Sequence, residues 1–147
     1  AISELTYAIN YKTQDFEQVI NEATDNGGVD VILDMVGGPY LERNLSLLRR
    51  DGRLVYIAFL GGRKAKEVNL GPIMMKRLTI TGSTMRARST AEKAEIAQGL
   101  KEQIAPLWAK GECLPMIYKT FKFDQIQDAH AAMDTGEHVG KVVVEII

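Results

Sequence analysis

The sequence predicts an α/β protein with a doubly wound, mostly parallel sheet, and three observations lead to this prediction. Segments rich in β-branched residues alternate with segments of helical periodicity, and glycines follow the predicted strands. Val29–Asp34 is a mostly apolar run that is broken by Asp30 and closed by Asp34. Such a run suits a strand that is covered on both faces, as in a parallel sheet between helices. Gly37, Gly38 and Pro39 follow it, and proline is favoured at the first position of a helix.

The first half of the chain is assigned from its periodicity, capping residues and turn residues. We first expect a strand at Tyr7–Tyr11, then a helix that is capped by Asp15 and buries Phe16, Val19, Ile20 and Ala23. The strand Val29–Asp34 follows, and after it a helix that starts at Pro39 and buries Leu41, Leu45 and Leu48. We then expect a turn at Asp51–Gly52, a strand at Arg53–Ala58, and one or two helical turns at Pro72–Lys76.

The second half of the chain continues the alternation. Leu78–Gly82 alternates apolar residues with threonine, which favours a half-exposed edge strand. After it we expect a helix that is opened by the capping box Ser89–Glu92, buries Ala94, Ala97, Leu100 and Ile104, and ends or kinks at Pro106. A strand at Tyr118–Phe123 follows, and then a helix that is capped by Asp124 and bears Ile126, Ala129 and Met133. The last expected element is a strand at Lys141–Ile147.

This architecture predicts where a ligand binds. Parallel strands joined by right-handed crossovers all finish at one edge of the sheet, and ligands bind beyond that edge. The loops Asp34–Gly38, Ala58–Gly62 and Ser83–Arg88 are therefore expected side by side. The sequence thus predicts a crevice without identifying its ligand.

Composition excludes several classes of function. The formal net charge of −1 gives no field for binding nucleic acid, and no stretch approaches the roughly 18 apolar residues that a membrane-spanning helix needs. A single cysteine, Cys113, forms no intramolecular disulfide and favours a reducing cytoplasm. Two histidines and one cysteine, not clustered, predict no metal site.

Five segments resemble, in family order, the zinc-independent quinone oxidoreductases of the medium-chain dehydrogenase/reductase superfamily: AINYKTQDF, GGVDVILDMVGGPYLERNL, DGRLVYIAFLGG, LTITGSTMRARS and HVGKVVVEI. The resemblance implies that residues 1–147 are part of a Rossmann-like NADPH-binding domain, together with the C-terminal segment that returns to the catalytic domain. It also implies that the catalytic domain, the first two strands and the Gly-rich turn lie outside this chain. In the family order, Tyr7–Tyr11 would be strand three and Val29–Asp34 strand four.

The resemblance implies an NADPH-dependent quinone oxidoreductase that passes hydride or electrons to a quinone or similar electron-poor acceptor, with no catalytic side chain in this part of it. An enoyl or other activated-alkene reductase of the same superfamily is one alternative. A non-catalytic module for dimerisation or nucleotide binding is another. The family pairs its sixth strand across a dimer, which here implies a homodimer through Leu78–Gly82.

The resemblance also implies which residues contact NADPH. Tyr11 is expected beside the 2′-phosphate, Val36, Gly37 and Gly38 along the cofactor and its ribose, the backbone of Ala58, Phe59 and Leu60 at the nicotinamide carboxamide, Thr84, Met85 and Arg86 around the nicotinamide, and Lys141 near the cofactor. For Asp34 two roles stay open, because a carboxylate at this point either binds a ribose hydroxyl or caps the helix at Pro39.

Overall fold

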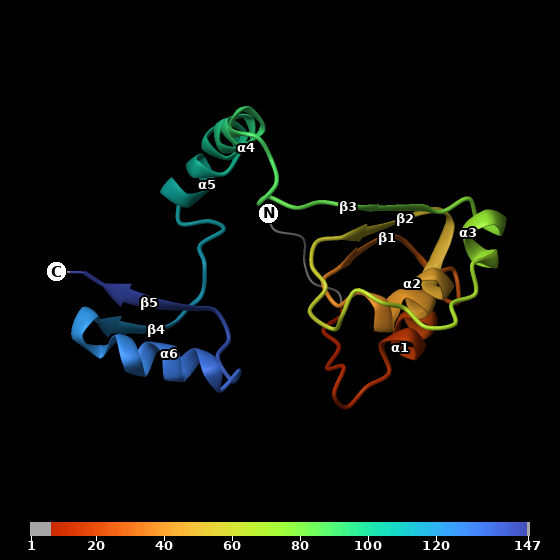
Figure 1. Ribbon diagram of the computed structural model, residues 1–147, viewed down its shortest axis with the longest axis horizontal. Helices are drawn as coiled ribbons and strands as arrows, with labels where there is room; N and C mark the ends of the chain where they lie inside the picture. The colour runs from red at the N-terminus through yellow and green to blue at the C-terminus, as the bar shows by residue number, and fades with distance from the viewer. Residues whose placement is uncertain (1–6, 147) are drawn as a thin grey trace. The chain divides into compact units, whose positions relative to one another are not determined.

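The computed structural model describes residues 7–146, which form two compact units, residues 7–90 and residues 91–146 (Figure 1). The first unit contains α1 (Phe16–Ala23), β1 (Val29–Asp34), the 3-10 helix η1 (Gly38–Tyr40), α2 (Leu41–Leu47), β2 (Leu48–Tyr56), α3 (Gly71–Met75) and β3 (Thr79–Gly82). Its sheet has the order β1-β2-β3, and both strand pairs are parallel. The predicted parallel α/β class is confirmed.

The second unit has a smaller sheet of its own. It contains α4 (Thr90–Gln103), α5 (Ala105–Ala109), β4 (Ile117–Lys122), the 3-10 helix η2 (Phe123–Gln125), α6 (Ile126–Asp134) and β5 (Lys141–Glu145). β4 and β5 pair in parallel, and α6 contacts both strands. The described strands therefore form two sheets, which differs from the single sheet expected from the sequence.

The core of the first unit lies between α2 and β2. Leu45, Leu47, Leu48 and Leu54 are almost completely buried, and burying each such side chain stabilises the fold by roughly 1.5–3 kcal/mol. α2 ends at Leu47 and β2 begins at the next residue, so Leu48, expected on the helix, opens the strand. The ammonium of Lys76 donates hydrogen bonds to the carbonyl oxygens of Leu45, Ser46 and Leu48 (3.2, 2.8 and 2.8 Å), which satisfies the end of α2.

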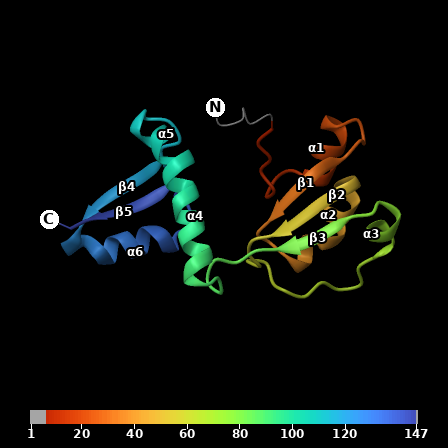
Figure 2. The same cartoon turned by 90° about the horizontal axis from the view of Figure 1, so that it is seen from above.

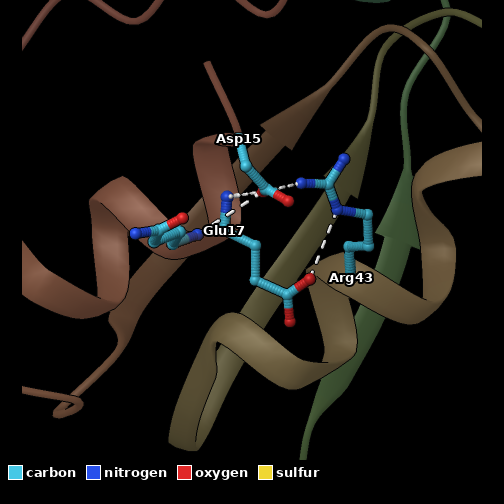
Figure 3. Close-up of polar contacts among 4 residues, drawn as sticks. Asp15, Glu17 and Arg43 are labelled. Atoms are coloured by element: carbon cyan, nitrogen blue, oxygen red, sulfur yellow. Dashed lines mark hydrogen bonds and ion pairs between the residues drawn. The ribbon is translucent and has the colours of Figure 1, made fainter.

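An arginine joins the two helices that lie on the same side of the sheet. Asp15 caps α1 by accepting a hydrogen bond from the Glu17 amide (2.9 Å), as the sequence predicts. Arg43 of α2 forms ion pairs with both Asp15 and Glu17, the latter at 3.3 Å (Figure 3). Its guanidinium also lies 3.8 Å from the centre of the Phe16 ring. This cluster fixes α1 against α2 through charge and cation–π contact.

Two expectations about the region from Tyr7 to the end of β1 are wrong. Tyr7–Tyr11 is not a strand, because no described strand lies beyond β1 to provide backbone partners. β1 has the predicted bounds, but Val31 and Leu33 on one of its faces are 60% and 64% exposed. Only the face toward α1 and α2 is covered, as Figure 1 shows. An apolar run therefore does not by itself show that a strand is covered on both sides.

β2 starts earlier than predicted, since the expected turn at Asp51–Gly52 lies inside the strand. Asp51 adopts a left-handed conformation (φ +64°), and the register with β1 shifts at this end of the sheet. β2 is therefore bent and not interrupted. Among the described strands β3 lies at an edge of its sheet, as predicted. All four of its residues are exposed, whereas the sequence predicted a half-exposed strand.

In the second unit the structure corrects three details. α4 has no buried residue, so Ala94, Ala97 and Leu100 are not inward as expected. Asp124 does not cap α6 with its side chain but lies in η2, where Gln125 accepts a hydrogen bond from the Lys122 amide (3.1 Å). The helix does break before Pro106, which sits in the first turn of α5. β5 ends at Glu145, and Ile147 lies outside the described residues.

Candidate functional site: the carboxyl edge of the first sheet

The carboxyl ends of β1, β2 and β3 lie together at one edge of the first sheet (Figure 2). Asp34 of β1 is in register with Tyr56 of β2, which in turn is in register with Gly82 of β3. The three loops that follow these strands therefore start side by side, as predicted. We call this edge, formed by residues 34–38, 57–62 and 83–86, the rim.

Backbone hydrogen bonds join the first two loops of the rim. The amide of Leu60 donates to the Met35 carbonyl (2.9 Å), and the amide of Gly61 donates to the Val36 carbonyl (2.8 Å). In the opposite direction, the Gly38 amide donates to the Gly62 carbonyl (2.9 Å). These bonds make the two loops one rigid surface.

Gly37 and Gly38 are needed for this close approach. Gly37 has φ +97°, and a Cβ there would lie 2.5 Å from the Gly62 carbonyl oxygen and 2.7 Å from the Phe59 ring. A Cβ at Gly38 would overlap the backbone of Lys64. The two glycines thus admit the neighbouring loop, a role that the sequence alone did not reveal.

Asp34 is the buried polar centre of the rim, with only 5% of its surface exposed. Its Oδ1 atom accepts hydrogen bonds from the amides of Val36 (2.6 Å) and Gly37 (2.7 Å). Its Oδ2 atom accepts one from the side-chain amide of Asn44, a residue of α2 that is 3% exposed. Of the two roles left open by the sequence, these contacts resemble capping, although the amides belong to the turn before the helix.

The second loop offers hydrogen-bond donors. No described residue accepts a hydrogen bond from the amide of Ala58 or Phe59. Ala58 is half-buried, whereas the side chains of Phe59 and Leu60 are exposed at the rim. Two unpaired amides next to apolar side chains suit a flat ligand that carries a carbonyl group.

The third loop is the most open part of the rim. The Ser83 amide donates to the Tyr56 carbonyl (2.9 Å), which ties the start of this loop to β2. Thr84, Met85 and Arg86 are exposed beyond that point. The loop thus places one cation and one thioether where the strands end.

Two predicted ligand contacts are not among the residues that form the rim. Tyr11 belongs to the turn before α1, where it is 67% exposed. Lys141 is the first residue of β5 in the second unit, and its amide donates to the Met116 carbonyl (2.8 Å). The other ten predicted residues lie on the three loops that make up the rim.

Sequence reasoning missed two residues that support the rim, Asn44 of α2 and Tyr56 at the end of β2. Asn44 is a polar residue on the otherwise apolar face of α2, and that break in the pattern was a usable signal. Tyr56 stacks against Phe59 at 5.2 Å between ring centres. Burial, together with the negative charge of Asp34, raises the pKa of the Tyr56 phenol.

Among residues 7–146, no three or more His, Cys, Asp or Glu side chains are grouped as metal ligands would be. No helix in this part of the chain is long and apolar enough to cross a membrane.

Comparison with known proteins agrees with this architecture. A family profile described as zinc-binding dehydrogenase matches residues 4–144. The human quinone oxidoreductase is 25% identical over 92% of the chain, and a 2-haloacrylate reductase from a Burkholderia species is 29% identical over 94%. The solved structure of the CurK enoyl reductase covers 94% of the chain with 26% identity and a TM-score of 0.63.

The chain spans about two fifths of the length of each of these proteins (39%, 41% and 40%). Although the family is described as zinc-binding, no group of His, Cys, Asp or Glu side chains among the described residues could hold a zinc ion. The profile covers nearly the whole chain, and the described strands have the parallel order expected of the fold. The chain therefore belongs to the zinc-binding dehydrogenase family of the medium-chain dehydrogenase/reductase superfamily, and carries part of its nucleotide-binding domain.

Proposed function

We propose that the rim binds the nicotinamide half of NADPH in an oxidoreductase that reduces a quinone or a similar electron-poor acceptor. The observation that carries this proposal is the joining of two post-strand loops into one surface with unpaired amides at Ala58 and Phe59. Ligands of open parallel sheets bind at this edge. The relatives named above as quinone oxidoreductase, 2-haloacrylate reductase and enoyl reductase support the same class of chemistry.

The chain's own residues bind and orient the cofactor. The amides of Ala58 and Phe59 are donors for the carboxamide oxygen, and the Phe59 ring gives that site an apolar wall. Val36 and Met85 are apolar side chains on the two flanking loops. When bound, NADPH supplies the hydride, so the protein's part here is placement and exclusion of water.

The electron acceptor distinguishes this proposal from its nearest alternative, an enoyl or other activated-alkene reductase. A quinone and an enoyl thioester are both electron-poor, and all three relatives described above have names compatible with such acceptors. Steady-state assays on the longest natural form of the protein, with a quinone panel and an enoyl-thioester panel, separate the two. We expect a higher kcat/KM for quinones, and a preference for enoyl thioesters would favour the alternative.

Cofactor binding is tested directly by titration. Nicotinamide fluorescence should show that the protein binds NADPH more tightly than NADH. The expected contacts of Tyr11 with the 2′-phosphate and of Lys141 with the cofactor remain predictions. Replacing Ala58 by proline removes one amide hydrogen, and we expect it to weaken NADPH binding about tenfold, the equivalent of about 1.4 kcal/mol. Failure of the unmodified protein to bind either dinucleotide refutes the proposal.

We also propose that β3 pairs with its copy in a homodimer. All four residues of β3 are exposed, and among the described strands β3 is at an edge of the first sheet. Light scattering after size exclusion tests this, and Ile80→Asp should shift the mass toward the monomer. A dimer that binds no dinucleotide would instead favour a non-catalytic module.

A further inference from the structure

Two backbone amides of the turn that follows β1 converge on one point, as they also do in anion-binding turns. Consecutive amides in a turn often point at one place and form a concave site for a phosphate or carboxylate. Here the amides of Val36 and Gly37 both point at a single oxygen, Oδ1 of Asp34 (2.6 and 2.7 Å). The protein therefore fills this concave site with its own carboxylate.

The next amide in the turn is also occupied, because Gly38 donates to the Gly62 carbonyl (2.9 Å). Three consecutive amides at the rim are thus unavailable to a ligand. A phosphate placed here would meet the buried charge of Asp34 and find no donor among them. By contrast, carbonyl oxygens keep a second lone pair, so hydroxyl groups of a ligand still find acceptors.

Asn44 holds the carboxylate in this orientation. Its side-chain amide donates to Oδ2 of Asp34, and both residues are almost fully buried. α2 carries Asn44, so the helix holds one oxygen of the carboxylate while the turn holds the other. The charge is paired with donors on both oxygens, which makes its burial tolerable.

We propose that Asp34 and Asn44 form a positioning pair, in which the carboxylate occupies the anion site of the Val36–Gly37 turn and so reserves this part of the rim for the uncharged nicotinamide–ribose portion of the dinucleotide. This inference rests on the proposed function. It assigns Asp34 an indirect role, since its side chain holds the turn and does not itself bind the ribose.

Two ligands separate positioning from general stability, using the longest natural form of the protein. NADPH carries both halves of the dinucleotide, whereas 2′,5′-ADP lacks the nicotinamide half. For Asn44→Ala we expect the Kd of NADPH to rise about tenfold while the Kd of 2′,5′-ADP stays within about twofold. Lys76→Met, which weakens the same helix away from the pair, is the matched control and should leave the ratio of the two Kd values unchanged.

A chemical rescue tests the filled anion site without the dinucleotide. Asp34→Ala frees the two amides, so added formate should raise its thermal midpoint by several degrees more than that of the unmodified protein. Hydrogen exchange gives a second readout if this variant does not fold. In Asn44→Ala, exchange at the Val36 and Gly37 amides should accelerate at least tenfold, while Leu54 in the β2 ladder is unaffected.

The possible failures are distinguishable. If the unmodified protein binds no dinucleotide but formate rescue and exchange behave as expected, the proposed function fails and the positioning of the turn stands. If the two Kd values change together in Asn44→Ala, the pair is only structural and the inference is overturned. Rapid exchange at Val36 and Gly37 in the unmodified protein also overturns it.

Discussion

Replacing Gly37 by alanine tests why glycine is required at this position. Two reasons are possible: the positive φ of the backbone, and the close approach of the two rim loops. The new Cβ would lie 2.5 Å from the Gly62 carbonyl oxygen and 2.7 Å from the Phe59 ring. The neighbouring loop must then move, which strains the hydrogen bonds that Gly38 and Gly61 make across the rim. Alanine at φ +97° also costs about 1–3 kcal/mol through backbone strain alone.

Gly62 provides the matched control. It also has a positive φ (+114°), but a Cβ there meets no atom within 4 Å. Gly62→Ala therefore has the conformational cost without the clash. Losing two hydrogen bonds at about 1 kcal/mol each makes Gly37→Ala less stable than Gly62→Ala by about 2 kcal/mol.

Urea unfolding followed by NMR measures this difference within the first unit, using signals from β1 and β2. With a typical dependence on urea of about 1–3 kcal/mol per molar, the midpoint of Gly37→Ala should lie about 1 M below that of Gly62→Ala. Equal midpoints for the two variants would show that the loops separate without cost, and the account of the rim as one rigid surface would be wrong.

Three further predictions concern single side chains. Lys76→Met should lower the free energy of unfolding of the first unit by about 1–2 kcal/mol in urea titrations, because three carbonyl oxygens lose a charged donor. The control Lys66→Met, at an exposed position, should leave that free energy unchanged within error. Burial and the charge of Asp34 raise the pKa of Tyr56. The stability that the neutral phenol contributes is therefore complete below about pH 10 and is lost as the pH rises through the folded-state pKa. An absorbance titration should show one late-ionising phenol, which Tyr56→Phe removes and Asp34→Asn shifts toward lower pH. Arg43→Lys should destabilise the contact between α1 and α2 by about 0.5–1 kcal/mol, since lysine keeps the charge but lacks the planar guanidinium that pairs with two carboxylates. Thermal melts that show no change would mean that these ion pairs do not contribute to stability.

Local signals in the sequence were sufficient for much of the first unit. The bounds of β1, the cap of α1 by Asp15 and the edge position of β3 follow from residues adjacent in the chain. The common edge for the loops follows from the handedness of parallel crossovers, which is a general property of such sheets. These features depend on short stretches of sequence, and the structure has them as predicted.

Features that depend on contacts between distant residues were not predicted. Asp34 has a structural partner because α2 brings Asn44 beside it, ten positions later in the chain. The need for Gly37 arises from Gly62 and Phe59 on another loop. Likewise, the exposure of Val31 and Leu33 depends on which elements cover the sheet, and an apolar run carries no information about that.

The uncovered side of β1 has a practical consequence for work on the isolated chain. Val31 and Leu33 are exposed on a strand that has no described neighbour along its outer edge. Unpaired backbone beside aliphatic side chains is a template for strand addition between molecules. We expect concentrated samples to aggregate slowly into β-rich assemblies, and Leu33→Lys to prolong their shelf life.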